Sequence, residues 1–278
     1  MNQPVISKAR IVRDLAALGV APGDILAVHS SLKAIGWVEG GPDAVVDALM
    51  ETLTPEGTLL MPAMNRPVPV WLHAQTPSAV GAVSEAFRRR QGVARSLHPT
   101  HSACAWGKHA DRILAGHPAA SALGVDSPFH RLAKLGGRVL MLGATYTSCS
   151  LVHVAEAIAK VPYLGIFYPG YEVDLRARLA NGVELTFHPF ENPGDSACFE
   201  VVERRLRAEG RLIEGRIGQA ASTLALGTDI LRAALECLLE NPESLVYDPD
   251  KPTSAVRAAS LRTIRETGWR LLALPPVV

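Results

Sequence analysis

Short apolar runs that end in glycine, serine or proline alternate with segments of helical periodicity along most of this chain. The segments 24–29, 57–61 and 138–142 are typical of buried strands, and 102–106 is a further strand candidate. Strands that alternate with helices form parallel or mixed sheets with helices on both faces. The pattern therefore predicts a three-layer α/β fold whose mixed sheet is mostly parallel. In such a sheet, ligands bind beyond the carboxyl ends of the strands.

Helical periodicity marks the segments that connect these strands. Helices are expected at 41–53, 80–90, 108–116, 128–135 and around residue 153. Pro42 stands in the first turn of the first of these segments, where proline is favoured. The proline-rich stretch 64–80 lacks this periodicity, so we expect a long surface excursion there.

The pattern changes beyond residue 160. Polar and apolar residues alternate on both sides of Asn181-Gly182, which is a strong hairpin signal. Helices are expected to follow at 197–209, 223–241 and 254–267. We therefore expect residues 1–160 and the C-terminal helices up to residue 278 to form the α/β core. Residues 162–222 are expected to form a smaller, partly antiparallel attachment.

Composition narrows the class of protein. The chain has 278 residues, of which 48% are hydrophobic, so it can bury a large core. Its 28 basic and 27 acidic residues nearly cancel and form no long run of one sign, which disfavours nucleic acid as a partner. No apolar stretch approaches the roughly 20 residues that a membrane-spanning helix needs, and the first residues lack a secretory signal pattern. We expect a globular protein with no membrane attachment.

The cysteines indicate a compartment. Cys104, Cys149, Cys198 and Cys237 are far apart in the sequence and form no CxxC pair. This spacing disfavours a disulfide framework and a structural zinc site. A reducing cytoplasm is the expected location.

One segment carries the chemistry of a proton transfer. After the apolar run 138–142 the chain breaks at Gly143, and a helix follows that carries His153 and Glu156. Side chains three residues apart share a face of a helix, so the imidazole and the carboxylate are expected to meet. The helix N-terminus disfavours a protonated imidazole whereas Glu156 favours one, which suits a general base near neutral pH. His153 is therefore the candidate base and Glu156 its orienting partner.

Three segments together resemble the aminoglycoside 3-N-acetyltransferase family. They are Val28-His-Ser-Ser-Leu-Lys-Ala-Ile-Gly36, the segment from Glu85 to His98-Pro-Thr-His-Ser102, and the segment from Ser127 through Gly143 to Ser148-Cys-Ser-Leu-Val-His-Val-Ala-Glu156. The same order and approximate spacing extend from about residue 8 to residue 160, and more loosely to about residue 240. Members of this family transfer an acetyl group from acetyl-coenzyme A to the amine at position 3 of a deoxystreptamine antibiotic, which confers resistance.

The resemblance implies a role for several residues. His153 is expected to take the proton from the attacking amine, Glu156 to support it, and His29 to face the active-site cleft. The implied coenzyme-contacting residues are Ser30, Ser31, Leu32, Lys33, Thr100 and Ser102. Residues 1–160 and the C-terminal helices then form the acetyl-coenzyme A-binding core, and 162–222 the substrate side. Cys149-Ser150-Leu151 stands where many relatives have Asn-Thr-Ser, so hydrogen bonds from that Asn are missing.

A polycationic substrate calls for carboxylates and flat surfaces. Glu191 and Asp195 lie in a turn-rich stretch that is expected to reach the cleft rim, although loop acids are often simply solvated. Trp71 and Tyr146 are candidate walls for the sugar rings, with core packing as the alternative. The hydroxyls of Thr145, Thr147 and Ser148 either cap the following helix or donate to the oxyanion; these alternatives stay open.

Other interpretations remain at this point. His98 and His101 are candidate metal ligands, but no known ligand spacing accompanies them, so no metal is expected. A hydrolase with Ser30 or Cys149 as nucleophile lacks a GxSxG elbow, and direct transfer is preferred. An acyltransferase for a primary amine that is not an antibiotic and a purely binding protein are the remaining alternatives. Monomer and homodimer are both compatible with the sequence.

Overall fold

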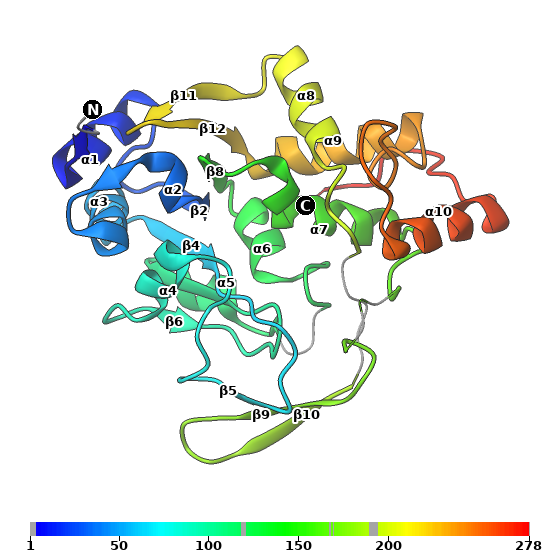
Figure 1. The fold of residues 1–278 in the computed structure, drawn as a ribbon, viewed down its shortest axis with the longest axis horizontal. Coiled ribbons are helices and arrows are strands. Elements are labelled where there is room, and N and C mark those ends of the chain that lie inside the picture. The colour runs from blue at the N-terminus through cyan, green and yellow to red at the C-terminus, as the bar shows by residue number, and fades with distance from the viewer. Residues whose placement is uncertain (1–3, 118–120, 167, 169, 189–193, 278) are drawn as a thin grey trace.

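The computed structural model describes residues 4–117, 121–166, 168, 170–188 and 194–277, and its centre is a seven-stranded sheet (Figure 1). The strand order is β11-β12-β8-β2-β4-β7-β6. The strands are β2 (Ile25–Ser30), β4 (Thr58–Pro62), β6 (Ala94–Arg95), β7 (Ala103–Gly107), β8 (Arg138–Leu142), β11 (Ile213–Ile217) and β12 (Ala220–Leu226). Strand β2 pairs in parallel with both β4 and β8, so these three strands end at the same edge of the sheet.

The central strands are apolar throughout because both faces of the sheet are buried. In β8, Val139 and Met141 belong to one hydrophobic core, and Leu140 and Leu142 belong to the other. Successive side chains of a strand point to opposite faces, so a strand buried on both faces has no polar positions. The continuous apolar run that predicted this strand is therefore explained by two separate cores.

Helices cover each face of the sheet. One core includes residues of α1 (Lys8–Ala17), α2 (Leu32–Ile35), α3 (Gly41–Leu53) and α4 (Ala82–Arg88). The other core includes residues of α5 (Ala110–Leu114), α6 (Pro128–Lys134), α7 (Ser150–Ala159), α8 (Glu200–Ala208), α9 (Gly227–Glu240) and α10 (Ala255–Thr267). This arrangement confirms the predicted three-layer α/β class (Figure 1). None of the described helices combines the length and the apolar character that crossing a bilayer requires.

A smaller sheet stands apart from the large one. It has the order β10-β9-β5, with β5 (Val70–Leu72), β9 (Leu175–Arg178) and β10 (Glu184–Phe187). Strands β9 and β10 form the antiparallel hairpin that Asn181-Gly182 predicted, and β5 joins β9 in parallel. The stretch 64–80, expected to be a surface excursion, thus contributes a strand here. A further short pair joins β1 (Val5–Ile6) to β3 (Trp37–Val38).

Two details of the prediction are wrong. The described sheet is not mostly parallel, because β12 with β8, β11 with β12, β4 with β7, and β6 with β7 are antiparallel pairs. Residues 223–226 belong to β12 and not to a helix, and α9 begins at Gly227. Hydrogen bonding of β12 to β8 outweighs the helical periodicity of that segment, which is a tertiary effect.

The proposed division of the chain stays a prediction. Within 162–222, the hairpin lies outside the large sheet, whereas β11 and the first part of β12 are paired into it. Helix α8 packs its buried Val202 and Leu206 into the core that covers one face of the large sheet.

Gly143 sets the turn by which β8 leads into the helix carrying His153. Its φ is +65°, and a Cβ atom there would lie 2.6 Å from Ala34 Cβ and 2.9 Å from Ala220 Cβ. Any other residue at this position therefore meets both backbone strain and a steric clash.

We predict that Gly143→Ala lowers the free energy of unfolding by about 3 kcal/mol or more, the sum of left-handed strain and overpacking. Gly136→Ala is the matched control, because Gly136 also has a positive φ (+73°) but has no atom within 4 Å of the point that a Cβ would occupy. The control should cost only about 1 kcal/mol. Urea denaturation of both variants tests this, and equal losses would contradict it.

Candidate active site

A cavity of about 330 Å³ lies at the edge of the large sheet where the parallel strands end. Its wall includes His29 and Ser30 at the end of β2 and Pro62 at the end of β4. The segment after β8 contributes Thr147, Ser148 and His153. This is the position at which sheets of α/β proteins bind ligands. Three separate chain segments therefore meet at one site, as the sequence predicted.

His153 and Glu156 form the pair that the sequence predicted. The distance from His153 Nδ1 to Glu156 Oε2 is 2.6 Å, and both residues lie on the first turns of α7. Glu156 is fully buried, whereas His153 is 9% exposed and lines the cavity. With Nδ1–H donated to the carboxylate, the lone pair of the neutral ring lies on Nε2. The ring is therefore oriented to accept a proton at Nε2.

A tyrosine completes the environment of Glu156. The hydroxyl of Tyr163 donates a hydrogen bond of 2.8 Å to Glu156 Oε1. Burial raises the pKa of the Tyr163 phenol well above its usual value, and the adjacent carboxylate raises it further, so the phenol stays protonated. Both oxygens of the buried carboxylate thus have a hydrogen-bond donor, which offsets the cost of removing its charge from water. Phe199 packs edge-on against the His153 ring at 4.6 Å between centroids.

His29 also lies in the cavity wall, but in a different electrostatic state. Its ring stacks on Phe129 at 5.6 Å, and only 4% of the residue is exposed. Burial lowers the pKa of His29 to about 4, so the ring is neutral at pH 7. Within the described residues, its buried Nε2 has no hydrogen-bond partner. A neutral imidazole there can contact a ligand but brings no positive charge to the site.

The implied coenzyme-contacting residues occupy different positions. Ser30 lines the cavity, and Ser31 begins α2, where its N–H donates to the carbonyl of Leu142. Leu32 is partly buried, and Lys33 is exposed on α2. Thr100 and Ser102 are fully buried and do not line the cavity.

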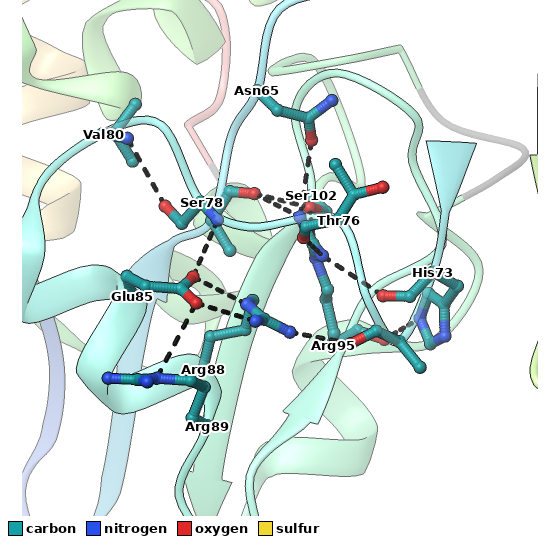
Figure 2. Close-up of polar contacts among 12 residues, drawn as sticks. Asn65, His73, Thr76, Ser78, Val80, Glu85, Arg88, Arg89, Arg95 and Ser102 are labelled. Carbon is teal, nitrogen blue, oxygen red and sulfur yellow. Dashed lines mark hydrogen bonds and ion pairs between the residues drawn. The ribbon is translucent and has the colours of Figure 1, made fainter. Parts of the chain in front are cut away.

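Arg95 holds the loops behind the cavity together (Figure 2). Its guanidinium donates to the hydroxyl of Ser102 at 2.9 Å and to the carbonyls of Ala63 and Thr76 at 2.8 and 2.6 Å. It also lies 4.9 Å from the centroid of the Trp71 ring, which is a cation–π contact. Burial lowers the pKa of Arg95 to about 10, so the group stays charged at neutral pH.

Trp71 and Tyr146 are not brought to the cavity. Trp71 is fully buried against Arg95, and Tyr146 is 1% exposed within the hydrophobic core below α7. Neither residue lines the cavity. Core packing, the alternative to a sugar-binding wall, therefore describes both rings. The tyrosines that do line it are Tyr168 and Tyr171.

Of the two predicted substrate carboxylates, Glu191 lies outside the described residues. Asp195 is described, and its carboxylate already accepts hydrogen bonds from the Ala197 N–H, the Ser254 hydroxyl and the Tyr168 hydroxyl at 2.7–2.9 Å. Burial raises the pKa of Asp195, but these hydrogen bonds outweigh it and hold the pKa below its usual value. Asp195 does not line the cavity, although it orients Tyr168, which does.

Hydroxyl groups beside the dyad remain available to a ligand. The helix α7 and the short η2 helix (Tyr146–Ser148) have no side-chain hydrogen bond at their N-caps. The capping alternative is therefore not realised for Thr147 and Ser148, which line the cavity. Thr145 and Thr147 share a hydrogen bond of 2.6 Å between their hydroxyls.

The alternative nucleophile is poorly placed. Cys149 is 1% exposed and does not line the cavity, and burial raises the pKa of its thiol to about 12. A thiol of this kind does not form the thiolate that attacks an acyl group. Ser30 lines the cavity, but no histidine nitrogen is hydrogen-bonded to it among the described contacts.

The candidate metal ligands have other roles. His98 Nδ1 accepts the backbone N–H of His101 at 2.9 Å, so this nitrogen is already used inside the protein. No cluster of three or more metal-ligating side chains occurs in the part of the chain that the structure describes. His101 lines the cavity, a position for which the sequence offered only the metal interpretation. The sequence did not indicate Tyr168 and Tyr171 either, because their segment shows only loop composition.

A histidine oriented by a buried carboxylate, in a cavity at the carboxyl ends of α/β strands, defines a general-base enzyme. The model of the family described as aminoglycoside 3-N-acetyltransferase matches residues 27–238. Aminoglycoside N(3)-acetyltransferase VII of Streptomyces paromomycinus is 32% identical over 261 residues, which cover 81% of this chain and 89% of the relative.

Solved structures agree. A histidine-to-alanine variant of aminoglycoside acetyltransferase AAC(3)-IVa in complex with a gentamicin has a TM-score of 0.80 at 30% identity, covering 95% of this chain and all (100%) of that one. The binary complex of AAC-IIIb with CoASH has a TM-score of 0.76 at 26% identity, covering 90% and 100%. The chain belongs to the aminoglycoside 3-N-acetyltransferase family. It is an acetyltransferase with acetyl-coenzyme A as its co-substrate.

Buried neutral histidines predict acid sensitivity of the fold. The pKa values of His29 and His117 are lowered by burial from 6.5 to about 4. Between these values the unfolded chain binds more protons than the folded one, so the free energy of unfolding falls as the pH falls from 6.5 toward 4. Each such ring contributes about 1.4 kcal/mol per pH unit in this window.

Urea unfolding at a series of pH values measures this slope. His117→Gln should reduce the slope, because it removes one of the titrating rings. His188→Gln is the control, because the His188 side chain is 79% exposed, and it should leave the slope unchanged. A free energy of unfolding that is constant from pH 6.5 to pH 4.5 in the unsubstituted protein would contradict the prediction.

Proposed function

We propose that this enzyme acetylates the 3-amino group of a deoxystreptamine aminoglycoside by direct transfer from acetyl-coenzyme A, with His153 as the general base. The observation that carries the proposal is the 2.6 Å contact of His153 Nδ1 with the buried Glu156 beside the cavity. Family membership supplies the reaction, and this geometry supplies the residue for its proton transfer. Acetylation of the amine confers resistance in this proposal, with the enzyme acting in the cytoplasm.

The reaction needs one proton acceptor and no covalent enzyme intermediate. The neutral amine attacks the thioester carbonyl carbon, the C–N bond forms, and the carbonyl electron pair moves onto oxygen. His153 Nε2 takes the proton from the nitrogen, and Glu156 stabilises the imidazolium. The tetrahedral intermediate then collapses, the C–S bond breaks with its electron pair on sulfur, and the imidazolium returns the proton to the thiolate.

Coenzyme contacts are proposed for the turn after β2. Ser30 lies in the cavity wall, so it contacts the pantetheine end near the thioester. Ser31 and Leu32 extend this contact outward, and the exposed ammonium of Lys33 supplies positive charge for the phosphates. Thr100 and Ser102 are buried, so in this proposal they act through the loop that they hold.

The acceptor is the part of the proposal that most needs testing. None of the described residues that line the cavity is a carboxylate, although the substrate is a polycation. We assign that role to Glu191, which lies outside the described residues, while Asp195 orients the Tyr168 hydroxyl. The neutral lining of the described cavity favours, as a second candidate, a primary amine that is not an antibiotic.

Thiol release tests the acceptor directly. The purified protein is mixed with acetyl-coenzyme A and, separately, with a panel of deoxystreptamine aminoglycosides and of simple primary amines. We expect release of coenzyme A thiol with at least one aminoglycoside and an acetyl group on its 3-amino nitrogen by NMR. Turnover with the simple amines alone would establish the second candidate and would falsify the antibiotic one.

His153→Ala is expected to lower kcat by about 10²–10⁴-fold, because it removes the acceptor of the amine proton. The Michaelis constant for acetyl-coenzyme A should change little, since the thioester does not need the base in order to bind. His109→Ala is a matched control, because His109 lies beside Thr58 at the opposite end of β4. Steady-state kinetics of both variants measure this, and an unchanged kcat in His153→Ala would remove the base from the proposal.

A further inference from the structure

A second histidine of the cavity wall has no part in the proposed base chemistry. His101 lines the same cavity as His153, and it comes from the loop between β6 and β7. Its ring lies 6.2 Å from the ring of Tyr171, which is another residue of the cavity wall. His101 is close enough to His153 for the two rings to interact electrostatically. The cavity therefore has one imidazole that is paired with a carboxylate and another, nearby, that is not.

One ring nitrogen of His101 is already engaged. Its Nδ1 lies 2.8 Å from the hydroxyl of Thr100, and Thr100 is fully buried. The backbone of Thr100 is fixed as well, because its carbonyl accepts the N–H of Asn65 at 2.9 Å. A hydroxyl that donates to Nδ1 places the proton of a neutral imidazole on Nε2. Nε2–H is then the group that His101 presents to a ligand.

The loop that carries His101 is held by a stack of buried rings. His98 Nδ1 accepts the backbone N–H of His101, and the His98 ring stacks on His117 at 4.9 Å. His117 is fixed in turn, with Nε2 donating to the carbonyl of Ala122 at 3.1 Å and Nδ1 accepting from the Ser96 hydroxyl at 2.7 Å. The end of the loop is tied down by the Arg95 network through Ser102, as Figure 2 shows.

The ring of His101 is uncharged at neutral pH. Burial lowers its pKa to about 3, and the neighbouring His153 and His117 rings lower it further. A neutral imidazole N–H is a hydrogen-bond donor that keeps its own proton and does not repel a protonated His153. Donors that are fixed in advance and aimed at developing negative charge are the main means by which acyl transfer is accelerated. Position, rigidity and charge state therefore suit one task.

We infer that His101 is a further catalytic residue, whose Nε2–H donates a hydrogen bond to the carbonyl oxygen of the acetyl thioester as this oxygen becomes an oxyanion. The inference rests on the proposed function, in which an amine attacks that carbonyl and His153 takes the proton. No bond to His101 forms or breaks. The carbonyl electron pair moves onto oxygen during attack and returns when the C–S bond breaks, and the proton stays on Nε2 throughout.

Three substitutions separate a donor from a structural side chain. His101→Ala removes the ring. His101→Asn keeps a polar atom for Thr100 but withdraws the donor from the cavity, and His101→Gln places an amide N–H near the position of Nε2. We expect kcat to fall about 10²-fold in His101→Ala and in His101→Asn, with little change in the Michaelis constant for acetyl-coenzyme A. His101→Gln should recover most of this loss, and His109→Ala is the matched control.

These outcomes decide the matter in either direction. A kcat of His101→Asn equal to that of the unsubstituted enzyme would overturn the inference, as would a His101→Gln variant no faster than His101→Ala. Should His101→Ala fail to fold, the comparison of His101→Asn with His101→Gln carries the same test, because both keep a polar side chain beside Thr100.

A measurement without any acceptor separates this inference from the proposed function. The infrared carbonyl stretch of acetyl-coenzyme A labelled with ¹³C at the carbonyl is recorded on the enzyme with no amine present. A hydrogen bond from His101 should lower this frequency in the unsubstituted protein and in His153→Ala, and the shift should be lost in His101→Asn. A shift that persists in His101→Asn overturns the inference. Failure of every aminoglycoside in the thiol-release assay would leave this readout intact and would count only against the proposed acceptor.

Discussion

The burial of β2, β4 and β8 on both faces is the constraint on which the rest of this structure depends. Two hydrophobic cores, one on each side of the sheet, remove polar side chains from these strands. Polar residues therefore first occur where the strands end, at His29 and Ser30 and in the segment that leads to His153. Parallel pairing aligns these ends at a single edge, so that a cavity forms there without any residue of the strand interiors.

Electrostatics within the cavity divides the histidines into two kinds. His153 is paired with a buried carboxylate, which stabilises the imidazolium that a general base becomes. His29 and His101 have no such partner, and burial keeps both rings neutral. The same residue type thus provides a base at one position and uncharged contacts at two others. The difference comes from a carboxylate three residues further along one helix, and from its absence beside the other two rings among the described contacts.

Local patterns predicted what local physics controls. The apolar runs gave the central strands, Asn181-Gly182 gave the hairpin, and helical spacing brought His153 to Glu156. Prediction failed where distant partners decide. The strand pairing of residues 223–226 depends on β8, which lies about eighty residues earlier in the chain. Trp71 was a candidate wall of the cavity, yet the Arg95 guanidinium packs against it within the interior. Asp195 has its acceptor capacity filled by groups from other segments.

By itself, the sequence determined the α/β class, the family and the dyad, because each is written in residues that are close together in the chain. Only the tertiary structure decided that His101 and Tyr168 line the cavity and that Thr100, Ser102 and Tyr146 do not. A loop residue has no periodicity from which its direction can be derived. Its side chain points wherever the contacts of its loop with distant segments place it, and those contacts exist only in the folded chain.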